Sequence, residues 1–294
     1  MQSDPFEEYR SLLFAMAYRM LGSAMEAEDI VQEAYLRYRA TPPESIRTLK
    51  SFLTTIVHNL CIDYLRSAQV QRENYVGPWL PEPVITGDGT ALMSPLRQII
   101  DRESISMAFL VLLESLSPLE RAVFLLREVF DYEYAEIAQI TGRDEAACRQ
   151  LCSRARKHIS NNRPRFPASP EAHSKMVSHF MEACIAGDID GLMSLLAEDV
   201  TAWIDGGGKV QVAGRQPVQG RDNVVRGIIK HLSRVPEGMT VEVIEANGLA
   251  ALLVRAKGQV TSLVTLEVEG NLIRAVRTVV NPDKLAHLKL PPTN

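Results

Sequence analysis

Residues 134–159 read YAEIAQITGRDEAACRQLCSRARKHI, and this stretch decides the fold of the second helical region. Tyr134–Ile140 has the apolar spacing of a short helix, and Thr141-Gly142 supplies a turn. Asp144 is a favourable N-cap for a second helix, which is basic. Two helices joined by a short glycine-containing turn, the second one basic, are typical of a helix-turn-helix.

The second helix of this pair has the side chains that DNA recognition needs. In a helix-turn-helix this helix lies in the major groove, with its N-terminal half toward the base edges. Donors for bases and phosphates are Arg149, Gln150, Ser153, Arg154, Arg156 and Lys157. The alternative is a solvated basic helix in an ordinary bundle, but the turn, the cap and the charge together favour DNA binding.

The first 73 residues have helical periodicity almost throughout. Asp4-Pro5 is a candidate helix start, with Asp4 as the N-cap and Pro5 at the first helical position, and Gly22 is a candidate helix end. A later helix has a wide apolar stripe between Leu49 and Leu65, so we expect this helix to be the core of its domain.

Charge is segregated along the chain, although the formal net charge is only −4. Residues 26–33 hold acids and no base: Glu26, Glu28, Asp29 and Glu33. Residues 149–165 hold bases and no acid: Arg149, Arg154, Arg156, Lys157, Arg163 and Arg165. Such patches indicate two different partners, one basic and one anionic, although the acidic run could also be a solvated helix face.

Length and composition exclude several classes of protein. A chain of 294 residues predicts two or three domains, and 46% hydrophobic with 23% charged residues excludes global disorder. There is no apolar run of transmembrane length and no secretory signal pattern, so we expect a cytoplasmic protein without a membrane partner. The cysteines and histidines lack metal-ligand spacing, so we expect neither metal nor cofactor; a redox role for Cys148 and Cys152 stays open.

Proline-rich linkers separate the helical regions from each other and from the last third of the chain. The first contains WLPEP at 79–83, and because a solvated linker rarely carries a tryptophan, we expect this segment to dock on a folded surface. Beyond the second linker, helices near 171–197 and 221–234 and four β-rich runs between 240 and 280 predict an α+β domain with an antiparallel meander.

Residues 205–209 read DGGGK and superficially resemble a phosphate-binding loop. Trp203 stands where that motif needs glycine and Val210 follows the lysine, so the motif fails, and a tight turn or a functional loop remains. An enzyme in this domain would draw on Asp205, Lys209, Trp203 and one of Arg274 or Arg277. No convincing acid–base pair is present, so we expect no catalysis.

Three parts of the chain resemble one known family. AEDIVQE at 27–33 resembles region 2 of extracytoplasmic-function (ECF) sigma factors. The resemblance continues in FL at 52–53, HN at 58–59, Asp63 and Arg66. SPLERAVFLLRE and YAEIAQITG resemble region 4, and FMEACIAGDIDGLMSLLAEDV is similar to a SnoaL-like domain of the nuclear-transport-factor-2 superfamily. WLPEP, DGGGK and NPDKL at 281–285, in this order, are typical of group 41 of the ECF sigma factors.

The resemblance implies a multidomain protein, with two all-α sigma domains and a C-terminal α+β SnoaL-like cone. Its segments are sigma region 2 at 1–73, a linker at 74–103, sigma region 4 at 104–163, a linker at 164–170, the SnoaL-like domain at 171–285 and a tail at 286–294. It implies a sigma factor that directs promoter-specific transcription initiation by core RNA polymerase.

The resemblance also implies roles for individual residues. The clamp helices of the polymerase β′ subunit would bind Asp29, Gln32 and Glu33. The −10 element would be read by His58, Asn59, Asp63 and Arg66, and the −35 element by the helix-turn-helix, with region 4 on the β flap. Cys148, Arg149 and Gln150 replace the V-K-S run that is commoner in the family, so the −35 preference is not carried over.

The SnoaL-like domain is implied to be a built-in regulator that acts on the sigma regions. The interdomain residues would be Trp79, Leu80, Pro81, Glu82, Pro83, Asp205, Gly206, Gly207, Gly208, Lys209, Asn281, Pro282, Asp283, Lys284 and Leu285. The alternatives are a domain that senses a small ligand or catalyses a reaction, and a dimeric repressor that works without polymerase. We expect a monomer when the chain is free.

Overall fold

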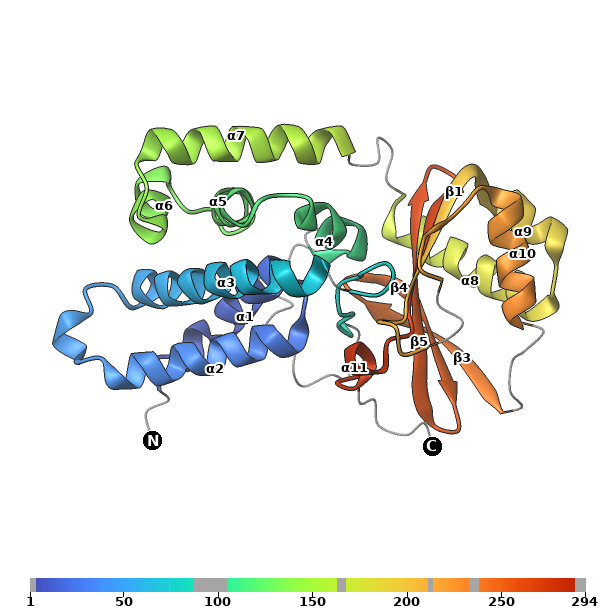
Figure 1. Cartoon of the computed structure of the whole chain (residues 1–294), viewed down its shortest axis with the longest axis horizontal. Coiled ribbons are helices and arrows are strands. Elements are labelled where there is room, and N and C mark those ends of the chain that lie inside the picture. Colours follow the sequence, from blue (N-terminus) through green and yellow to red (C-terminus); the bar gives the residue numbers. More distant parts are fainter. Residues whose placement is uncertain are drawn as a thin grey trace. The chain divides into compact units, whose positions relative to one another are not determined.

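Capping residues set the helix ends in the first part of the computed structural model (Figure 1). The helices are α1 (Glu7–Leu21), α2 (Ala24–Ala40), the 3₁₀ turn η1 (Pro43–Ser45), α3 (Leu49–Glu73), α4 (Met107–Glu114), α5 (Pro118–Glu128), α6 (Tyr134–Thr141) and α7 (Glu145–Asn162). Ser117 and Glu120 form a capping box at α5, and the Asp144 carboxylate accepts from the Ala147 N–H at 2.8 Å. The predicted helix-turn-helix is therefore present, with Gly142 in the left-handed conformation at its turn.

The first helix begins later than the sequence predicts. It starts at Glu7, and the Asp4 carboxylate accepts from the Phe6 N–H at 3.0 Å in the turn that precedes it. Asp4 was expected to cap a helix whose first residue is Pro5; it stabilises the entry turn instead.

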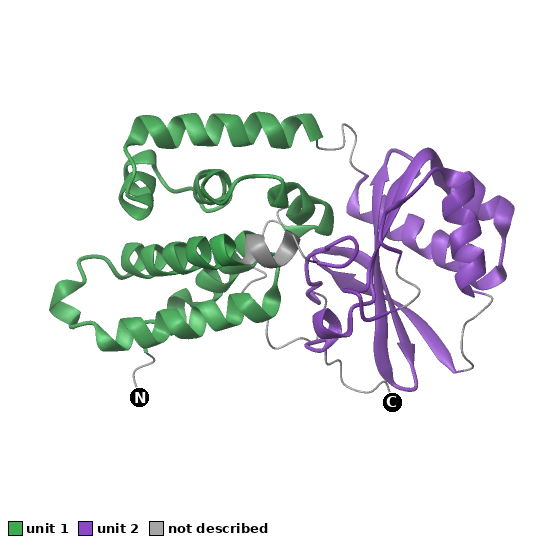
Figure 2. Cartoon of the chain, in the orientation of Figure 1, with its two compact units in different colours: residues 1–74, 91–163 green, residues 75–90, 164–294 purple. Residues whose placement is uncertain are grey.

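The structure describes residues 4–73, 75–86, 105–162, 168–210, 214–232 and 238–288. Several sequence predictions fall outside these ranges: the second half of the first linker, most of the second linker, Arg163 and Arg165, and the end of the C-terminal tail. The chain divides into two compact units (Figure 2): residues 1–74 with 91–163, and residues 75–90 with 164–294.

The first unit is helical and contains both predicted sigma regions. The centre of the apolar stripe of α3 is buried through Leu53, Val57, Cys61 and Leu65, while its margins are only partly buried, and α3 contacts α1, α2, α5 and α6. Buried polar groups also join the two regions: the Arg121 guanidinium donates to the Met20 carbonyl, and the hydroxyls of Thr54 and Tyr132 lie 2.8 Å apart. The two regions predicted as separate domains therefore share one core in this structure.

The second unit is built on a mixed six-stranded sheet in the order β2-β1-β6-β5-β4-β3. Its elements are α8 (Pro170–Ala186), α9 (Ile189–Leu195), β1 (Leu196–Asp205), β2 (Val218–Gln219), α10 (Arg221–Leu232), β3 (Met239–Ala246), β4 (Leu249–Ala256), β5 (Gln259–Glu269), β6 (Leu272–Val279) and α11 (Pro282–Leu285). The predicted antiparallel meander is β3 to β6, whereas β1 pairs with β6 in parallel.

The two faces of this sheet have different covers. Helices α8, α9 and α10 pack on one face over an apolar cluster that includes Val200, Leu252 and Leu266 (Figure 1). The opposite face carries a fully buried row across four strands: Asp205, Val279, Leu263 and Leu253. The linker segment 75–86 and α11 contact Asp205 in this row, so the linker is part of the folded core of the second unit.

Candidate functional site

The exposed face of α2 carries the residues predicted to bind polymerase. Ala27, Ile30, Val31 and Ala34 point into the helical unit, which leaves Asp29 and Gln32 exposed on the other side. Glu33 is half-exposed, and its carboxylate lies 2.8 Å from the Arg37 guanidinium. The predicted trio is therefore accessible, with two members free of described ion pairs and one paired within the helix.

Two large apolar side chains extend this face, and the charge pattern gave no sign of them. Met25 and Leu36 are 51% and 62% exposed, the latter among the most exposed large apolar residues described. Their spacing from Asp29 and Gln32 is helical, so the four side chains lie along one stripe. Methionine is enriched at protein interfaces, so the stripe is a candidate contact surface.

The residues predicted to read the −10 element divide between surface and core. Asn59 is exposed, and Asp63 and Arg66 are exposed partners 3.8 Å apart on the last turns of α3. His58 is only 5% exposed, because it lies on the side of α3 that faces the core. In this state, therefore, three of the four residues are accessible to DNA and His58 is not.

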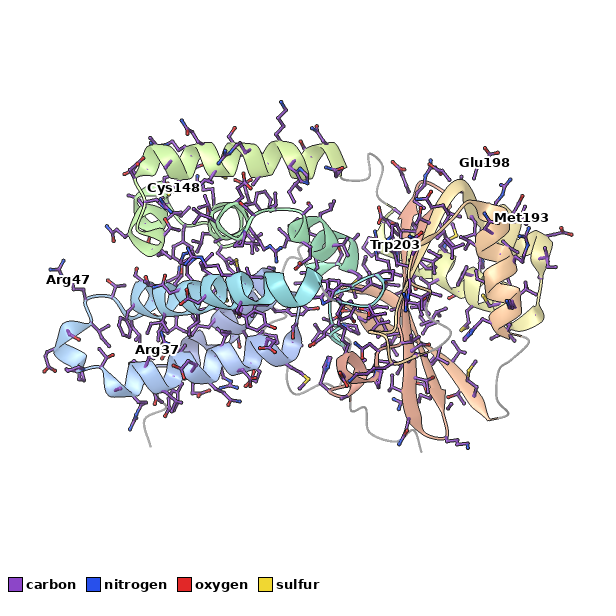
Figure 3. All side chains as sticks on the ribbon, in the orientation of Figure 1. Arg37, Arg47, Cys148, Met193, Glu198 and Trp203 are labelled. Atoms are coloured by element: carbon purple, nitrogen blue, oxygen red, sulfur yellow. The ribbon has the colours of Figure 1, made fainter. Side chains whose placement is uncertain are left out.

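Helix α7 exposes all six residues predicted to read the −35 element. The opposite side of the helix is buried through Cys148, Cys152, Ala155 and Ile159, and Cys148 faces the unit interior (Figure 3). Burial raises the pKa of the Cys152 thiol, which disfavours the reactive thiolate form. The two cysteines thus serve as core residues of the helix-turn-helix.

In the second unit, the three short motifs of the group 41 pattern meet at the Asp205 carboxylate. Its Oδ2 accepts from the Leu80 N–H at 2.8 Å and from the Lys284 ammonium at 2.7 Å. Its Oδ1 accepts from the Tyr75 hydroxyl at 2.5 Å and from the Gly207 N–H at 3.2 Å. Four donors occupy the lone-pair sites of this fully buried carboxylate.

Lys284 also contacts the tryptophan of the linker. Its ammonium is buried, lies 4.1 Å from the centre of the Trp79 ring and donates to the Leu80 carbonyl. WLPEP therefore docks on a folded surface, as expected, and that surface is the sheet of the second unit. Burial raises the pKa of the Tyr75 hydroxyl, and Asp205 raises it further because it accepts the hydroxyl proton in a hydrogen bond.

The rest of the linker segment pairs with β3 and with the turn that follows it. Ile85 forms an isolated antiparallel bridge with Ala246, and the Thr86 N–H donates to the Glu245 carbonyl at 3.0 Å. The Asn247 side chain accepts from the Val84 N–H at 3.0 Å. The linker therefore binds the second unit as an extended peptide does when it adds to a sheet edge.

The glycines of DGGGK are required by close approach. Gly207 and Gly208 have φ values of 56° and 73°, which side-chain-bearing residues rarely adopt. A Cβ on Gly207 would lie 2.4 Å from the Asn281 side chain and 3.1 Å from the Tyr75 hydroxyl. The loop is thus a tight turn that lets the linker and NPDKL reach Asp205, and Lys209 continues the contact through an exposed ion pair with Asp283.

The residues named as a possible catalytic set do not form one group. Arg277 is buried, lies 2.6 Å from Glu267 and sits over the ring of Trp203, which β1 carries (Figure 3). Arg274 pairs with Asp199 at the surface instead. Asp205 lies two residues from Trp203 on β1, but its described partners are the linker and α11, whereas those of Arg277 are Glu267 and Trp203.

Comparison with known proteins fits both units. The family model of Sigma-70 region 2 matches residues 5–70, and that of Sigma-70, region 4 matches residues 106–159. The ECF RNA polymerase sigma factor SigJ of Mycobacterium tuberculosis is 43% identical over 241 residues, which cover 81% of this chain and 76% of SigJ. The chain belongs to the ECF sigma factors. The crystal structure of SigJ superimposes on this sigma factor with a TM-score of 0.77 and 35% sequence identity. The match covers 96% of this sigma factor and 97% of the SigJ chain.

A second relative supports the match over the full length of the sigma factor. The probable ECF RNA polymerase sigma factor SigI of M. tuberculosis is 31% identical over 296 residues, covering 98% of this chain and 97% of its own. The predicted fold class is confirmed in its architecture: helical regions 2 and 4 precede an α+β unit. The sigma factor thus directs promoter-specific initiation with core RNA polymerase on promoter DNA.

The described part of the sigma factor contains neither a membrane-spanning helix nor a metal-binding cluster. Its described helices include none with the length and apolar character needed to cross a membrane. Within the same residues, no cluster of three or more His, Cys, Asp or Glu side chains could hold a metal ion.

Burial of His58 predicts a pH dependence of the helical unit. Burial lowers its pKa to about 4, below the ordinary value of 6.5, so His58 gains a proton on unfolding. Its contribution is complete above pH 6.5 and is lost as the pH falls toward 4, by at most about 3 kcal/mol. Denaturant unfolding followed by circular dichroism should show a steeper loss between pH 7 and 5 for the natural chain than for His58→Asn. Parallel curves would contradict this assignment.

Proposed function

We propose that this sigma factor works in the cytoplasm as a monomer whose C-terminal unit regulates it by holding the linker between regions 2 and 4. The exposed stripe of α2, with Asp29, Gln32 and the nearby Glu33, binds the clamp helices of the polymerase β′ subunit, and region 4 binds the β flap. Asn59, Asp63 and Arg66 act at the −10 element, and α7 acts at the −35 element. The observation that carries the regulatory part is the contact of Asp205 and Lys284 with the linker.

The linker matters because the promoter sets the separation of the two regions. Elements 25 base pairs apart lie about 85 Å apart along B-DNA, at about 3.4 Å per base pair. The chain between α3 and α4 reaches at most roughly 110 Å when extended, at about 3.4 Å per residue. With residues 75–86 held, the remaining residues 87–106 reach only about 70 Å. Holding the linker therefore limits how far regions 2 and 4 can separate.

A shared core of the two regions opposes the same separation. Arg121 and Tyr132 of region 4 form buried hydrogen bonds to region 2. These bonds must break before the two regions can bind promoter elements that lie about 85 Å apart. The energy for this comes from the polymerase and promoter contacts, which act at high effective concentration once the first region is bound.

Reconstituted transcription tests both parts of the proposal. Core polymerase with the full-length sigma factor is expected to give specific starts on genomic templates that core alone does not give. Lys284→Met removes the ammonium that holds Leu80 and Trp79, and it is expected to raise the yield of these starts several-fold. Glu198→Ala, which removes an exposed ion pair with Arg221 away from the linker contacts, is the matched control and should leave the yield unchanged.

The outcomes separate the two claims. No specific starts from any form would contradict promoter-specific initiation and favour a regulator that works without polymerase. Equal yields from the natural chain and Lys284→Met would leave initiation intact and contradict regulation through the linker.

The hydrogen bonds that Asp205 accepts argue against an enzyme active site at this residue. Its four accepted hydrogen bonds leave the carboxylate no lone pair for a substrate proton, and Lys284 is equally engaged. We infer that these residues have a structural and regulatory role, and that the C-terminal unit is not an enzyme at this position.

A further inference from the structure

Helix α7 has three distinct sides. The buried stripe of Cys148, Cys152, Ala155 and Ile159 packs into the helical unit. Directly opposite, at the same helical spacing, lies an outward row of Ala146, Gln150, Ser153 and Lys157, all exposed. The three arginines of the predicted DNA-binding set lie between these two sides, Arg149 and Arg156 on one flank and Arg154 on the other.

Each flanking arginine is paired with a glutamate of the same region. Arg156 lies 2.6 Å from Glu128 at the end of α5, and Arg149 lies 2.5 Å from Glu145. The Arg149 guanidinium also sits 5.3 Å from the centre of the Tyr134 ring.

The other flank repeats the arrangement. Arg154 lies 3.3 Å from Glu120, which the N-terminal cap of α5 fixes through its bonds to Ser117. Each arginine therefore has a defined position beside the groove-facing row.

The outward row has no such partners. Among the described residues, no hydrogen bond or ion pair involves the side chains of Gln150 or Ser153 or the ammonium of Lys157. These side chains are free to meet a new surface without breaking an existing contact. The amide of Gln150 is near the middle of the row, in the half of the helix that enters a major groove.

We propose that the two sets divide the work of the −35 helix: the outward row reads base edges and the flanking arginines bind backbone phosphates. This rests on the proposed function of α7 at the −35 element. Gln150 is the specificity-determining residue, and its side-chain amide matches adenine, with which it can form two hydrogen bonds at N6 and N7. Arg149, Arg154 and Arg156 exchange a carboxylate for a phosphate and carry no sequence information.

The paired glutamates become positioning residues in this scheme. They keep the guanidiniums at the two rims of the row, and they cancel part of the positive charge until a phosphate replaces them. Removal of one carboxylate is therefore expected to strengthen DNA binding by about 1.5–5-fold, the range of an exposed ion pair, and to do so on every sequence. A glutamate that merely stabilised the fold would weaken binding on removal.

Holoenzyme binding to a promoter library that varies only in the −35 element tests this division. Gln150→Ala is expected to lose about 5–150-fold on the preferred sequence and to lose an adenine preference at one position, with the salt dependence unchanged. Arg156→Ala should weaken binding by a similar factor on all sequences and lower the salt slope by about one. Glu128→Gln should strengthen binding on all sequences.

Three results would overturn the proposal: a uniform loss with Gln150→Ala, a changed base preference with Arg156→Ala, or weaker binding with Glu128→Gln. Holoenzyme that is indifferent to the −35 element in its natural form would instead contradict the function proposed for α7. Circular dichroism of each variant confirms that the helical unit is folded before binding is compared.

Discussion

Asp205→Ala is expected to lower the free energy of unfolding of the C-terminal unit by about 3–5 kcal/mol. Asp205 is fully buried, and without its carboxylate the Lys284 ammonium remains buried beside the Leu80 carbonyl and the rings of Trp79 and Tyr75. The Leu80 and Gly207 N–H groups and the Tyr75 hydroxyl also lose their acceptor. One substitution thus frees the linker and removes the carboxylate partner of a buried ammonium.

Tryptophan fluorescence measures this effect selectively. The chain has two tryptophans, Trp79 and Trp203, and both belong to the second unit. Denaturant unfolding followed by their emission therefore reports on that unit alone. Glu198→Ala is the matched control, since its side chain is 89% exposed and its ion pair with Arg221 is worth at most about 1 kcal/mol.

A second variant separates loss of the ion pair from loss of packing. Adding Lys284→Met to Asp205→Ala removes the unpaired charge and is expected to recover part of the stability. A midpoint for Asp205→Ala equal to that of the control would show that the linker contacts contribute little to the C-terminal unit.

Asp29→Lys is expected to weaken binding of core polymerase by at least about 30-fold. Asp29 is exposed at the centre of the α2 stripe, and a basic partner surface would meet a like charge there. Specific transcripts should fall in proportion, because the sigma factor cannot reach the promoter without polymerase. Fluorescence anisotropy of labelled sigma factor, titrated with core polymerase, measures the affinity.

Glu8→Lys gives the same change of charge at an exposed site on α1, away from the stripe. It is expected to alter the affinity by less than about threefold, through long-range electrostatics alone. Equal losses for the two variants would mean that net charge, rather than the α2 face, controls the association. A loss with Asp29→Lys that high salt restores would place the residue at the rim of the interface.

Local signals predicted the helical regions well. The capping box of Ser117, the turn at Gly142 and the cap at Asp144 depend on bonds within a few residues, so the sequence contains all of their partners. The acidic run of α2 was visible in the same way, because its members are neighbours in the sequence. The start of α1 was misplaced because Asp4 can satisfy an N–H in a turn as well as in a helix.

Contacts between residues far apart in the sequence were harder to predict. Hairpin signals predicted the meander, but the parallel pairing of β1 with β6 joins segments far apart, and no turn residue encodes it. Burial of His58 and the glutamate partners of the α7 arginines also depend on packing between elements. The resemblance named the motifs around Asp205, yet only the structure brings them together as one hydrogen-bonded cluster.

The linker has a consequence for the synthesis of the chain. Its residues bind partners that follow much later, since Tyr75 precedes Asp205 by 130 residues and Leu80 precedes Lys284 by 204. At about 5–20 residues per second, a ribosome needs roughly 10–40 s to supply the last of these partners. Every new molecule therefore makes its helical unit before the last contact that holds the linker can form, and a nascent chain that stops before Lys284 never forms that contact.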